Sequence, residues 1–167
     1  MKYSFPPLAD AEITVLVLGS LPGEKSLAMN EYYAHPCNRF WRVIAAVAGQ
    51  PLPTTYAGKQ ALLSRAGIGL WDVVRGASRE GSLDSAIRHE TPNDIPRFIA
   101  GHPRLRLLAF NGRKPALLFN KYFQPLPGIT YATLPGTSPA NAACGFDRLL
   151  EAWREALAPA LSTGEKG

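Results

Sequence analysis

The sequence predicts an α/β fold, with three layers (α/β/α) around a central, mostly parallel sheet of about four strands. Three observations predict it. Short runs of Val, Ile and Leu alternate along the chain with stretches of helical periodicity. These runs are almost continuously apolar, which is typical of strands buried on both faces of a sheet. Three of the four runs end at glycine, asparagine or proline, where a strand passes into a turn.

The N-terminal half contributes two strands and two helices to this prediction. The first strand is expected at 13–18 (ITVLVL), before a Gly-Ser pair. A helix is expected at 38–48, because apolar side chains recur there at helical spacing after Asn38, a favoured N-cap residue. A second helix at 55–66 stops at a glycine, and a second strand follows at 68–74 (IGLWDVV).

The C-terminal half repeats this alternation, and its closing helix is amphipathic. It is predicted to hold, in order, short helices at 82–88 and 94–100, a strand at 105–110, a helix at 113–123, a strand at 129–134 and the closing helix at 141–157.

A chain of 167 residues, 46% of them hydrophobic, suits one domain with its own core. Residues 1–160 are expected to form that domain and 161–167 a flexible tail. The stretch 122–146 has no Asp, Glu, Lys or Arg, but its four prolines argue against a membrane span. The two cysteines fit neither a disulfide framework nor a zinc motif, and the first residues lack a signal-peptide pattern. We therefore expect a soluble cytoplasmic protein without a metal.

The net charge of +5 is concentrated in two segments that contain no acidic residue. Residues 32–71 hold four basic side chains and residues 95–146 hold six. A surface that meets phosphates favours this exclusion of carboxylates, so the charge pattern indicates a nucleic-acid partner.

Ligands of open α/β sheets bind beyond the carboxyl ends of the strands. Three of the four ends here are rich in glycine, proline and small polar residues, which let a backbone approach a ligand closely. GSLPG at 19–23 fits neither a dinucleotide fingerprint nor a Walker loop, and alone it predicts only a turn. The other ends are Trp-Asp at 71–72, Phe-Asn-Gly at 110–112 and LPGTSPAN at 134–141.

The segment 32–41 (YYAHPCNRFW) combines four aromatic residues with a histidine, an asparagine and an arginine. Aromatic rings interleaved with basic residues form stacking platforms for nucleobases, and Tyr33 is the better stacking candidate. Simpler interpretations stay open. Phe40 fits the core, Asn38 fits a helix cap, and His35 before a proline fits a residue that orients the turn.

Asn111 ends a strand of core character, where an amide commonly satisfies the sheet end. An amide also offers an acceptor beside a donor and can read a base edge. Hypoxanthine and uracil present an N–H beside a C=O, whereas adenine and cytosine present an acceptor beside an amino group. An amide locked in one orientation would select the deaminated bases.

The loop 134–141 has two open interpretations. Ser138 followed by Pro139 is typical of an ordinary helix start. Its small residues also suit close contact with a DNA backbone or entry into a minor groove.

Together these four ordered motifs resemble the uracil-DNA glycosylase superfamily. The AHPCNRFW stretch is similar to the mismatch-specific uracil-DNA glycosylases. The combination GSLPG, YYAHPCNRFW, FNGRK and LPGTSPANA resembles the hypoxanthine-DNA (deoxyinosine) glycosylases, from about residue 14 to residue 153. The resemblance implies a uracil-DNA glycosylase-like fold and a monofunctional hydrolase with no metal or organic cofactor.

The resemblance also implies roles for single residues. Many superfamily members carry a catalytic Asn or Asp where this chain has Leu21, and in the hypoxanthine type the water-positioning role falls to Asn38. Asn111 matches the base-reading asparagine, and Tyr33 matches the aromatic that stacks on the flipped base. The candidates are, for catalysis, Asn38, Ser20 and Ser138; for base binding, Tyr33, Asn111, Leu21, Phe40 and His35; for DNA binding, Gly23, Lys25, Arg113, Lys114, Gly136, Thr137, Pro139, Ala140 and Asn141.

The function expected from these motifs is a DNA glycosylase of base excision repair. It would flip out and hydrolyse a deaminated base, with hypoxanthine preferred and uracil close behind. Three alternatives stay open: a lesion-binding module without catalysis, a glycosylase primarily for uracil in mismatches, and an enzyme acting on free nucleosides. We expect a monomer in the cytoplasm that reaches the nucleoid through its DNA substrate.

Overall fold

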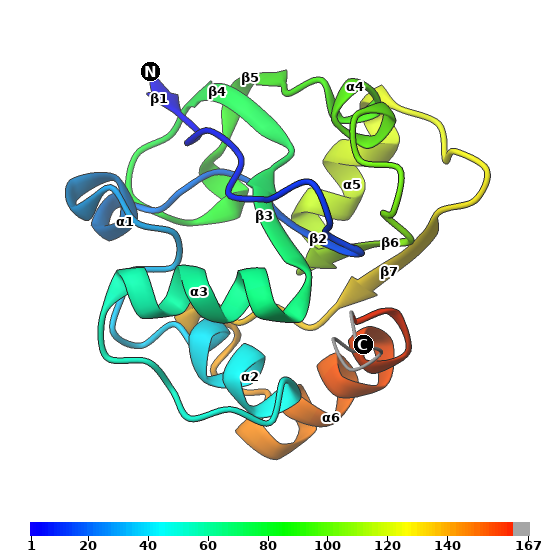
Figure 1. The fold of residues 1–167 in the computed structure, drawn as a ribbon. Helices are drawn as coiled ribbons and strands as arrows, with labels where there is room; N and C mark the ends of the chain where they lie inside the picture. Colours follow the sequence, from blue (N-terminus) through cyan, green and yellow to red (C-terminus); the bar gives the residue numbers. More distant parts are fainter. Residues whose placement is uncertain (162–167) are drawn as a thin grey trace.

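The computed structural model describes residues 1–161 of the chain. Strands and helices alternate through most of it, as Figure 1 shows. The elements are β1 (Lys2–Tyr3), β2 (Val15–Gly19), α1 (Glu24–Met29), α2 (Phe40–Val47), α3 (Tyr56–Ala66), β3 (Ile68–Asp72), β4 (Val74–Ser78), β5 (Arg88–Pro92), α4 (Ile95–Ala100), β6 (Leu107–Asn111), α5 (Arg113–Tyr122), β7 (Thr130–Leu134) and α6 (Phe146–Leu157), with short 3-10 turns at Asp84–Ala86, Pro139–Asn141 and Ala158–Ala160.

The central sheet has four strands in the order β3-β2-β6-β7, and every neighbouring pair is parallel. The predicted α/β class and the four-stranded parallel sheet are therefore confirmed. The register sets Gly19 opposite Asp72 and Asn111 opposite Leu134. The carboxyl ends of all four strands consequently reach one edge of the sheet.

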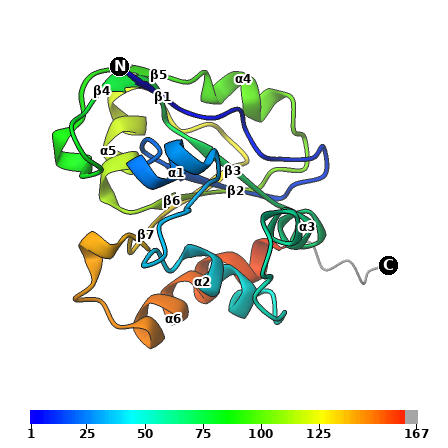
Figure 2. The same cartoon turned by 90° about the vertical axis from the view of Figure 1, so that its left-hand side faces the viewer.

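Helices cover both faces of this sheet (Figure 2). On one face, Val15 and Val17 of β2 pack in a core built with α2, α3 and α6. On the other face, Leu16 and Leu18 pack in a second core with α4, α5 and residues of β4. All four of these side chains are fully buried, which explains why the strand sequence is apolar at consecutive positions.

A second, antiparallel sheet of order β1-β4-β5 lies over one face, and the sequence did not predict it. The predicted strand 68–74 is broken at Val73, where the backbone N–H groups of Val73 and Val74 donate to the carbonyls of Gly19 and Ser20. These bonds turn the chain out of the central sheet and into β4.

The predicted helix at 82–88 is wrong. Only Asp84–Ala86 forms a single 3-10 turn, and β5 begins at Arg88. Leu83 and Ile87 are four residues apart, which is the spacing of apolar residues on one face of a helix. In the structure, however, Leu83 is 59% exposed and Ile87 is buried. The two side chains therefore do not share a face, and the apparent stripe is accidental.

Several element ends also differ from the prediction. The helix expected at 38–48 begins at Phe40, and the helix expected at 141–157 begins at Phe146 after the separate 3-10 turn. The short helix α1 was not predicted. Of the predicted tail 161–167, only Leu161 belongs to the described residues, and it packs partly buried against the core.

Among residues 1–161, none of the helices combines the length and apolar character needed to cross a bilayer.

Candidate active site

The four motifs meet in a cleft of about 1350 Å³ at the carboxyl ends of the central strands. All of the predicted site residues except Phe40 line it: Ser20, Leu21, Gly23, Lys25, Tyr33, His35, Asn38, Asn111, Arg113, Lys114, Gly136, Thr137, Ser138, Pro139, Ala140 and Asn141. The parallel sheet therefore brings segments about 120 residues apart to one place, as the rule for open α/β sheets predicts.

Two side-chain amides are joined by the hydroxyl of Thr137. Asn111 Nδ2 donates to Thr137 Oγ1 at 3.0 Å, and Thr137 Oγ1 donates to Asn38 Oδ1 at 2.8 Å. The sequence placed Thr137 among the DNA contacts, but its side chain is fully buried. Its hydroxyl instead connects the base-reading candidate to the water-positioning candidate.

The orientation of the Asn111 amide is fixed by this contact. The backbone N–H of Thr137 donates to Asn111 Oδ1 at 2.9 Å, and a backbone N–H can only donate. The oxygen of Asn111 is therefore assigned by its partner, and the amide is held in one orientation. One lone pair of Oδ1 and one hydrogen of Nδ2 have no partner among residues 1–161, which are the acceptor and donor that a base edge needs. The nearby Tyr33 hydroxyl has its pKa raised by burial, and the Asn111 side chain opposes that rise.

The side-chain oxygen of Asn38 accepts hydrogen bonds from other residues of the chain. Oδ1 accepts from the backbone N–H of Phe40 at 2.9 Å and from Thr137 Oγ1. The predicted capping role is thus partly right: Asn38 closes the turn before α2, although Arg39 separates it from the helix. Its Nδ2 has no partner among residues 1–161, so the group presented to a ligand is a donor.

Tyr33 lies against Phe40 at the wall of the cleft. The two rings stack with centroids 4.2 Å apart and planes 27° apart. The backbone of Tyr33 is left-handed, with φ of 54°. Phe40, also a candidate for base binding, is fully buried and is not among the residues that line the cleft. Phe40 instead supports Tyr33 from behind.

The floor of the cleft lies over Gly19. A Cβ at this position would come 2.7 Å from Asp72 Oδ1 and 3.1 Å from the hydroxyl of Tyr33. The hydroxyl of Tyr33 and Oδ2 of Asp72 are buried and have no hydrogen-bond partner among the described residues. The Asp72 carboxyl and the Tyr33 hydroxyl therefore pack directly against the backbone of Gly19, where only a glycine fits.

Asp72 is a cleft residue that the sequence analysis did not single out. It is 4% exposed and lines the cleft. Burial, with a smaller contribution from Asp84, raises the pKa of its carboxyl to about 7, and Arg79 opposes the shift. The sequence pattern that could have indicated Asp72 is a carboxylate at the carboxyl end of a predicted strand. Its burial depends on β4 and the following turn, which were not predicted.

Ser20 is held by the wall of the cleft. Its hydroxyl donates to Asp84 Oδ1, and the guanidinium of Arg79 donates to the carbonyl of Pro22. Arg79 Nη1 lies 3.9 Å from the same Asp84 oxygen. These contacts fix the GSLPG loop, so the hydroxyl of Ser20 braces the site in this structure.

The loop that carries the last motif is tied down from two sides. Arg39 donates to the carbonyl of Asn141 at 3.1 Å and to that of Cys144, and Trp153 Nε1 donates to the carbonyl of Pro135 at 2.9 Å. Ser138 Oγ accepts from the backbone N–H of Ala140, as in the simpler helix-start interpretation. The loop is therefore a rigid wall of small side chains.

Charges of both signs line the cleft. Lys25, Arg113 and Lys114 lie there as predicted. Glu24 and Asp84 line the same cleft, which the acid-free segments did not suggest. The exposed ring of His35 accepts from the backbone N–H of Cys37 at 3.0 Å, so it also orients the turn.

Leu83 is the second residue that the sequence reasoning missed. Among the exposed large apolar side chains of residues 1–161, it alone lines the cleft. The loop that carries it rests on the first motif, because Ser82 Oγ accepts from the backbone N–H of Glu24 at 2.8 Å.

Comparison with known proteins agrees with this geometry. The family model of the Uracil DNA glycosylase superfamily matches residues 6–159. The chain is similar to proteins named hypoxanthine DNA glycosylase: one from Methanosarcina acetivorans (41% identity, 84% of this chain and 89% of the relative) and one from Methanosarcina barkeri (40%, 68% and 72%). A solution NMR structure from M. acetivorans, described as a candidate uracil DNA glycosylase, superposes with a TM-score of 0.78 at 36% identity, covering 92% of this chain and 94% of that one. The predicted resemblance is confirmed, and the chain belongs to the uracil DNA glycosylase superfamily.

Proposed function

We propose that this chain is a monofunctional DNA glycosylase that flips out a deaminated base, hypoxanthine before uracil, and removes it by hydrolysis. One observation carries the proposal: the amide of Asn111 is locked in a single orientation at the carboxyl end of β6. The relatives named hypoxanthine DNA glycosylase support hypoxanthine as the preferred base. Since a single chain supplies every motif of the cleft, we propose that it acts as a monomer. A DNA substrate also favours our proposal that it works in the cytoplasm, at the nucleoid.

The locked amide would separate a deaminated base from its undamaged parent. Its free lone pair accepts the N–H of hypoxanthine or uracil, and its free N–H donates to the adjacent carbonyl. Adenine and cytosine present the reverse pattern. Their ring nitrogen would place an acceptor against Oδ1 of Asn111, and their amino group would place a donor against Nδ2. Each mismatch leaves buried polar groups unpaired, at about 1–3 kcal/mol per group.

Two side chains would take part in hydrolysis, one on the base and one on the attacking water. Tyr33 would stack on the extruded base, supported by Phe40. Asn38 would bind the attacking water through its Nδ2 hydrogens. An amide is no general base, so Asn38 orients the water, and most of the rate enhancement must come from stabilising the departing base.

The assay that tests the proposal uses duplexes with one hypoxanthine or one uracil, followed by alkali to cleave abasic sites. We expect cleavage at hypoxanthine, slower cleavage at uracil, and none in matched duplexes with adenine or cytosine. Binding without cleavage at either base would favour the lesion-binding module. Release from free deoxyinosine at the same rate as from DNA would favour the nucleoside enzyme.

Asn111→Ala is expected to lower single-turnover release of hypoxanthine by about 10²-fold or more, because two hydrogen bonds to a buried base edge are lost. Asn120→Ala on the exposed face of α5 is the matched control and should keep the wild-type rate. An Asn111→Ala protein with the wild-type rate and base choice would make Asn111 a structural residue.

Leu83 has the properties of the wedge that fills the gap left in the duplex. The loop 134–141 offers no large exposed apolar side chain, whereas Leu83 is 59% exposed at the rim of the cleft. Apolar wedges inserted between base steps offset part of the few kcal/mol needed for unstacking. Leu83 is therefore assigned to the extrusion step.

Leu83→Ala is expected to slow hypoxanthine release from duplex DNA by about tenfold or more, and to leave release from single-stranded DNA within about twofold. Leu117→Ala, which removes a side chain 62% exposed on α5, is the control. An equal loss on both substrates would assign Leu83 to the base pocket and not to extrusion.

A further inference from the structure

Asp72 has no task in the mechanism above, although its position is unusual. The side chain is buried at the floor of the cleft, and Oδ2 has no hydrogen-bond partner among the described residues. A buried carboxylate without a partner is strongly unfavourable, so the neutral acid is the form that this site favours. A neutral carboxylic acid is a proton donor.

The sheet aligns Asp72 with the base-reading amide. Asp72, Gly19 and Asn111 end three adjacent strands, β3, β2 and β6. Neighbouring strands lie about 4.8 Å apart, so Asp72 and Asn111 are separated by about two such spacings, with Gly19 and the hydroxyl of Tyr33 between them. Asp72, Tyr33 and Asn111 all line the cleft, so a flat ligand held by Asn111 lies on the same side of the sheet edge as Asp72, beside the Tyr33 hydroxyl.

The charged and titratable groups around Asp72 come from three segments. Asp84, from the 3-10 turn, and Arg79, after β4, act on its carboxyl in opposite directions. Tyr32 and Tyr33 face it from the segment 32–41; burial raises the pKa of both hydroxyls, and the Asp72 carboxyl adds to the rise. Because the Tyr33 hydroxyl keeps its proton at any working pH, Asp72 is the group of this cluster suited to proton transfer near neutrality.

We propose that Asp72 is the general acid that protonates the leaving purine. With N1–H and the 6-carbonyl of hypoxanthine on Asn111, the N7 edge beside that carbonyl points along the sheet edge toward Asp72. The inference rests on the proposed glycosylase function and extends it with an acid for one class of base.

The step balances as follows in atoms and electrons. The Asp72 O–H proton moves to N7 while the C1′–N9 bond breaks, and the electron pair of that bond stays on N9. Hypoxanthine leaves as its neutral N7–H tautomer. Water adds to C1′ of the sugar cation and releases one proton to solvent, and the Asp72 carboxylate takes one proton back from solvent.

This acid would distinguish purines from pyrimidines. Hypoxanthine has a second ring with a basic nitrogen that reaches beyond the edge read by Asn111. Uracil presents the same N–H and C=O pair but has no counterpart of N7. Proton transfer from Asp72 therefore accelerates release of hypoxanthine and leaves release of uracil unassisted.

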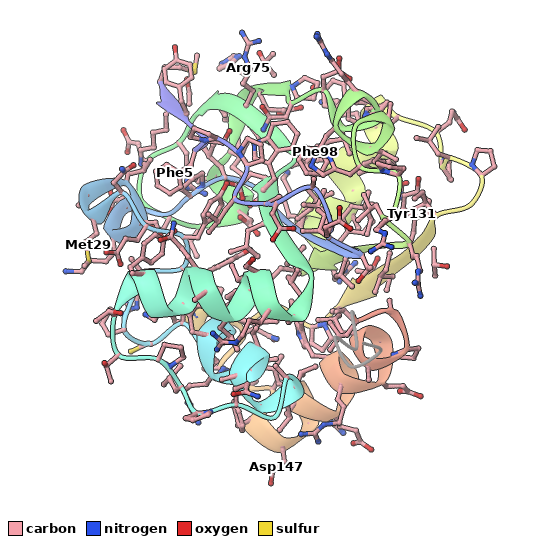
Figure 3. All side chains as sticks on the ribbon, viewed as in Figure 1. Phe5, Met29, Arg75, Phe98, Tyr131 and Asp147 are labelled. Atoms are coloured by element: carbon pink, nitrogen blue, oxygen red, sulfur yellow. The ribbon has the colours of Figure 1, made fainter. Side chains whose placement is uncertain are left out.

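The test is single-turnover release of hypoxanthine and of uracil by Asp72→Asn, a change that keeps the shape and a donor but removes the transferable proton. We expect a loss of about 10²-fold or more on hypoxanthine and less than about threefold on uracil. Asp147→Asn is the control, because Asp147 is exposed and projects away from the body of the protein (Figure 3). It should match the wild type on both bases.

The pH profile separates proton donation from a structural role. The wild-type rate on hypoxanthine should fall about tenfold per pH unit once Asp72 ionises above about pH 7, and Asp72→Asn should lose this limb. Tyr33→Phe keeps the ring, removes the neighbouring hydroxyl and should keep the limb. Folding is checked by thermal unfolding. Because the pKa of Asp72 is raised in the folded protein, the wild type should lose stability relative to Asp72→Asn as the pH rises from about 3.8 to about 7, and it should keep that deficit above pH 7.

The outcomes are distinct. Equal losses on both bases, an unchanged hypoxanthine rate, or an unchanged pH limb in Asp72→Asn would each overturn the role of Asp72 while the glycosylase function stands. Failure of the wild-type protein to release any base would overturn the proposed function, and the role of Asp72 with it.

Discussion

Replacing Gly19 by alanine is expected to reduce base release by more than about 10²-fold, because the floor of the cleft has no room for a methyl group. A Cβ at 2.7 Å from Asp72 Oδ1 is closer than carbon and oxygen atoms pack in proteins, and Tyr33 blocks the other side at 3.1 Å. Both neighbours are buried, so neither can move into solvent. The methyl group would also separate Asp72 from a base held on Asn111, and misplacement of a reacting group by about 1 Å costs about 10²-fold.

The measurement is single-turnover release of hypoxanthine, accompanied by thermal unfolding and by binding of a duplex. Gly101→Ala, at the end of α4, is the matched control, because its Cβ would meet backbone atoms only at ordinary distances of 3.6 Å and beyond. A Gly19→Ala protein that is folded and fully active would show that the base does not reach this floor.

Thr137→Val is expected to cause a loss of similar size by a different route. Valine has the shape of threonine but lacks the hydroxyl that accepts from Asn111 and donates to Asn38. Two amides then lose a partner in a buried site, at about 1–3 kcal/mol for each unpaired group. We expect the rate on hypoxanthine to fall about 10²-fold, because the base edge and the water lose their positioning together.

Thr137→Ser is the control that isolates the hydroxyl. Serine keeps Oγ and the backbone N–H to Asn111, so most of the rate should return despite the small cavity left by the methyl group. If Val and Ser lower the rate equally, packing around Thr137 matters and the hydrogen bonds do not. Binding of a duplex that contains a non-hydrolysable deoxyinosine analogue would show whether base reading is lost along with the rate.

The central sheet was predictable because its strands carry their own signal. β2 and β6 are continuously apolar, which follows from burial on both faces, and their ends fall at glycine and asparagine. The second sheet had no such signal. β5 (RHETP) is largely exposed, β4 contains a central glycine, and their pairing includes register shifts, so neither has an apolar run or a clean alternation.

The candidate site divides in the same way. Tyr33, Asn38 and Asn111 were found because each lies in a motif at the end of a strand or before a helix. The roles of Thr137 and Asp72 depend on packing between distant segments. Thr137 lies 26 residues from Asn111 and 99 from Asn38 along the chain, and no local pattern predicts that one hydroxyl meets both.

Tyr33 combines a bulky side chain with a left-handed backbone. A non-glycine residue in this region costs about 1–2 kcal/mol, and here the stack on Phe40 holds the residue in place. Glycine or asparagine at position 33 would relieve this backbone strain but would lose the packing of the ring on Phe40 and the core, and truncation of a buried aromatic costs more, about 3–5 kcal/mol. A laboratory evolution experiment that screens only for heat resistance should therefore keep an aromatic ring at position 33, so robustness and repair capacity are selected together there.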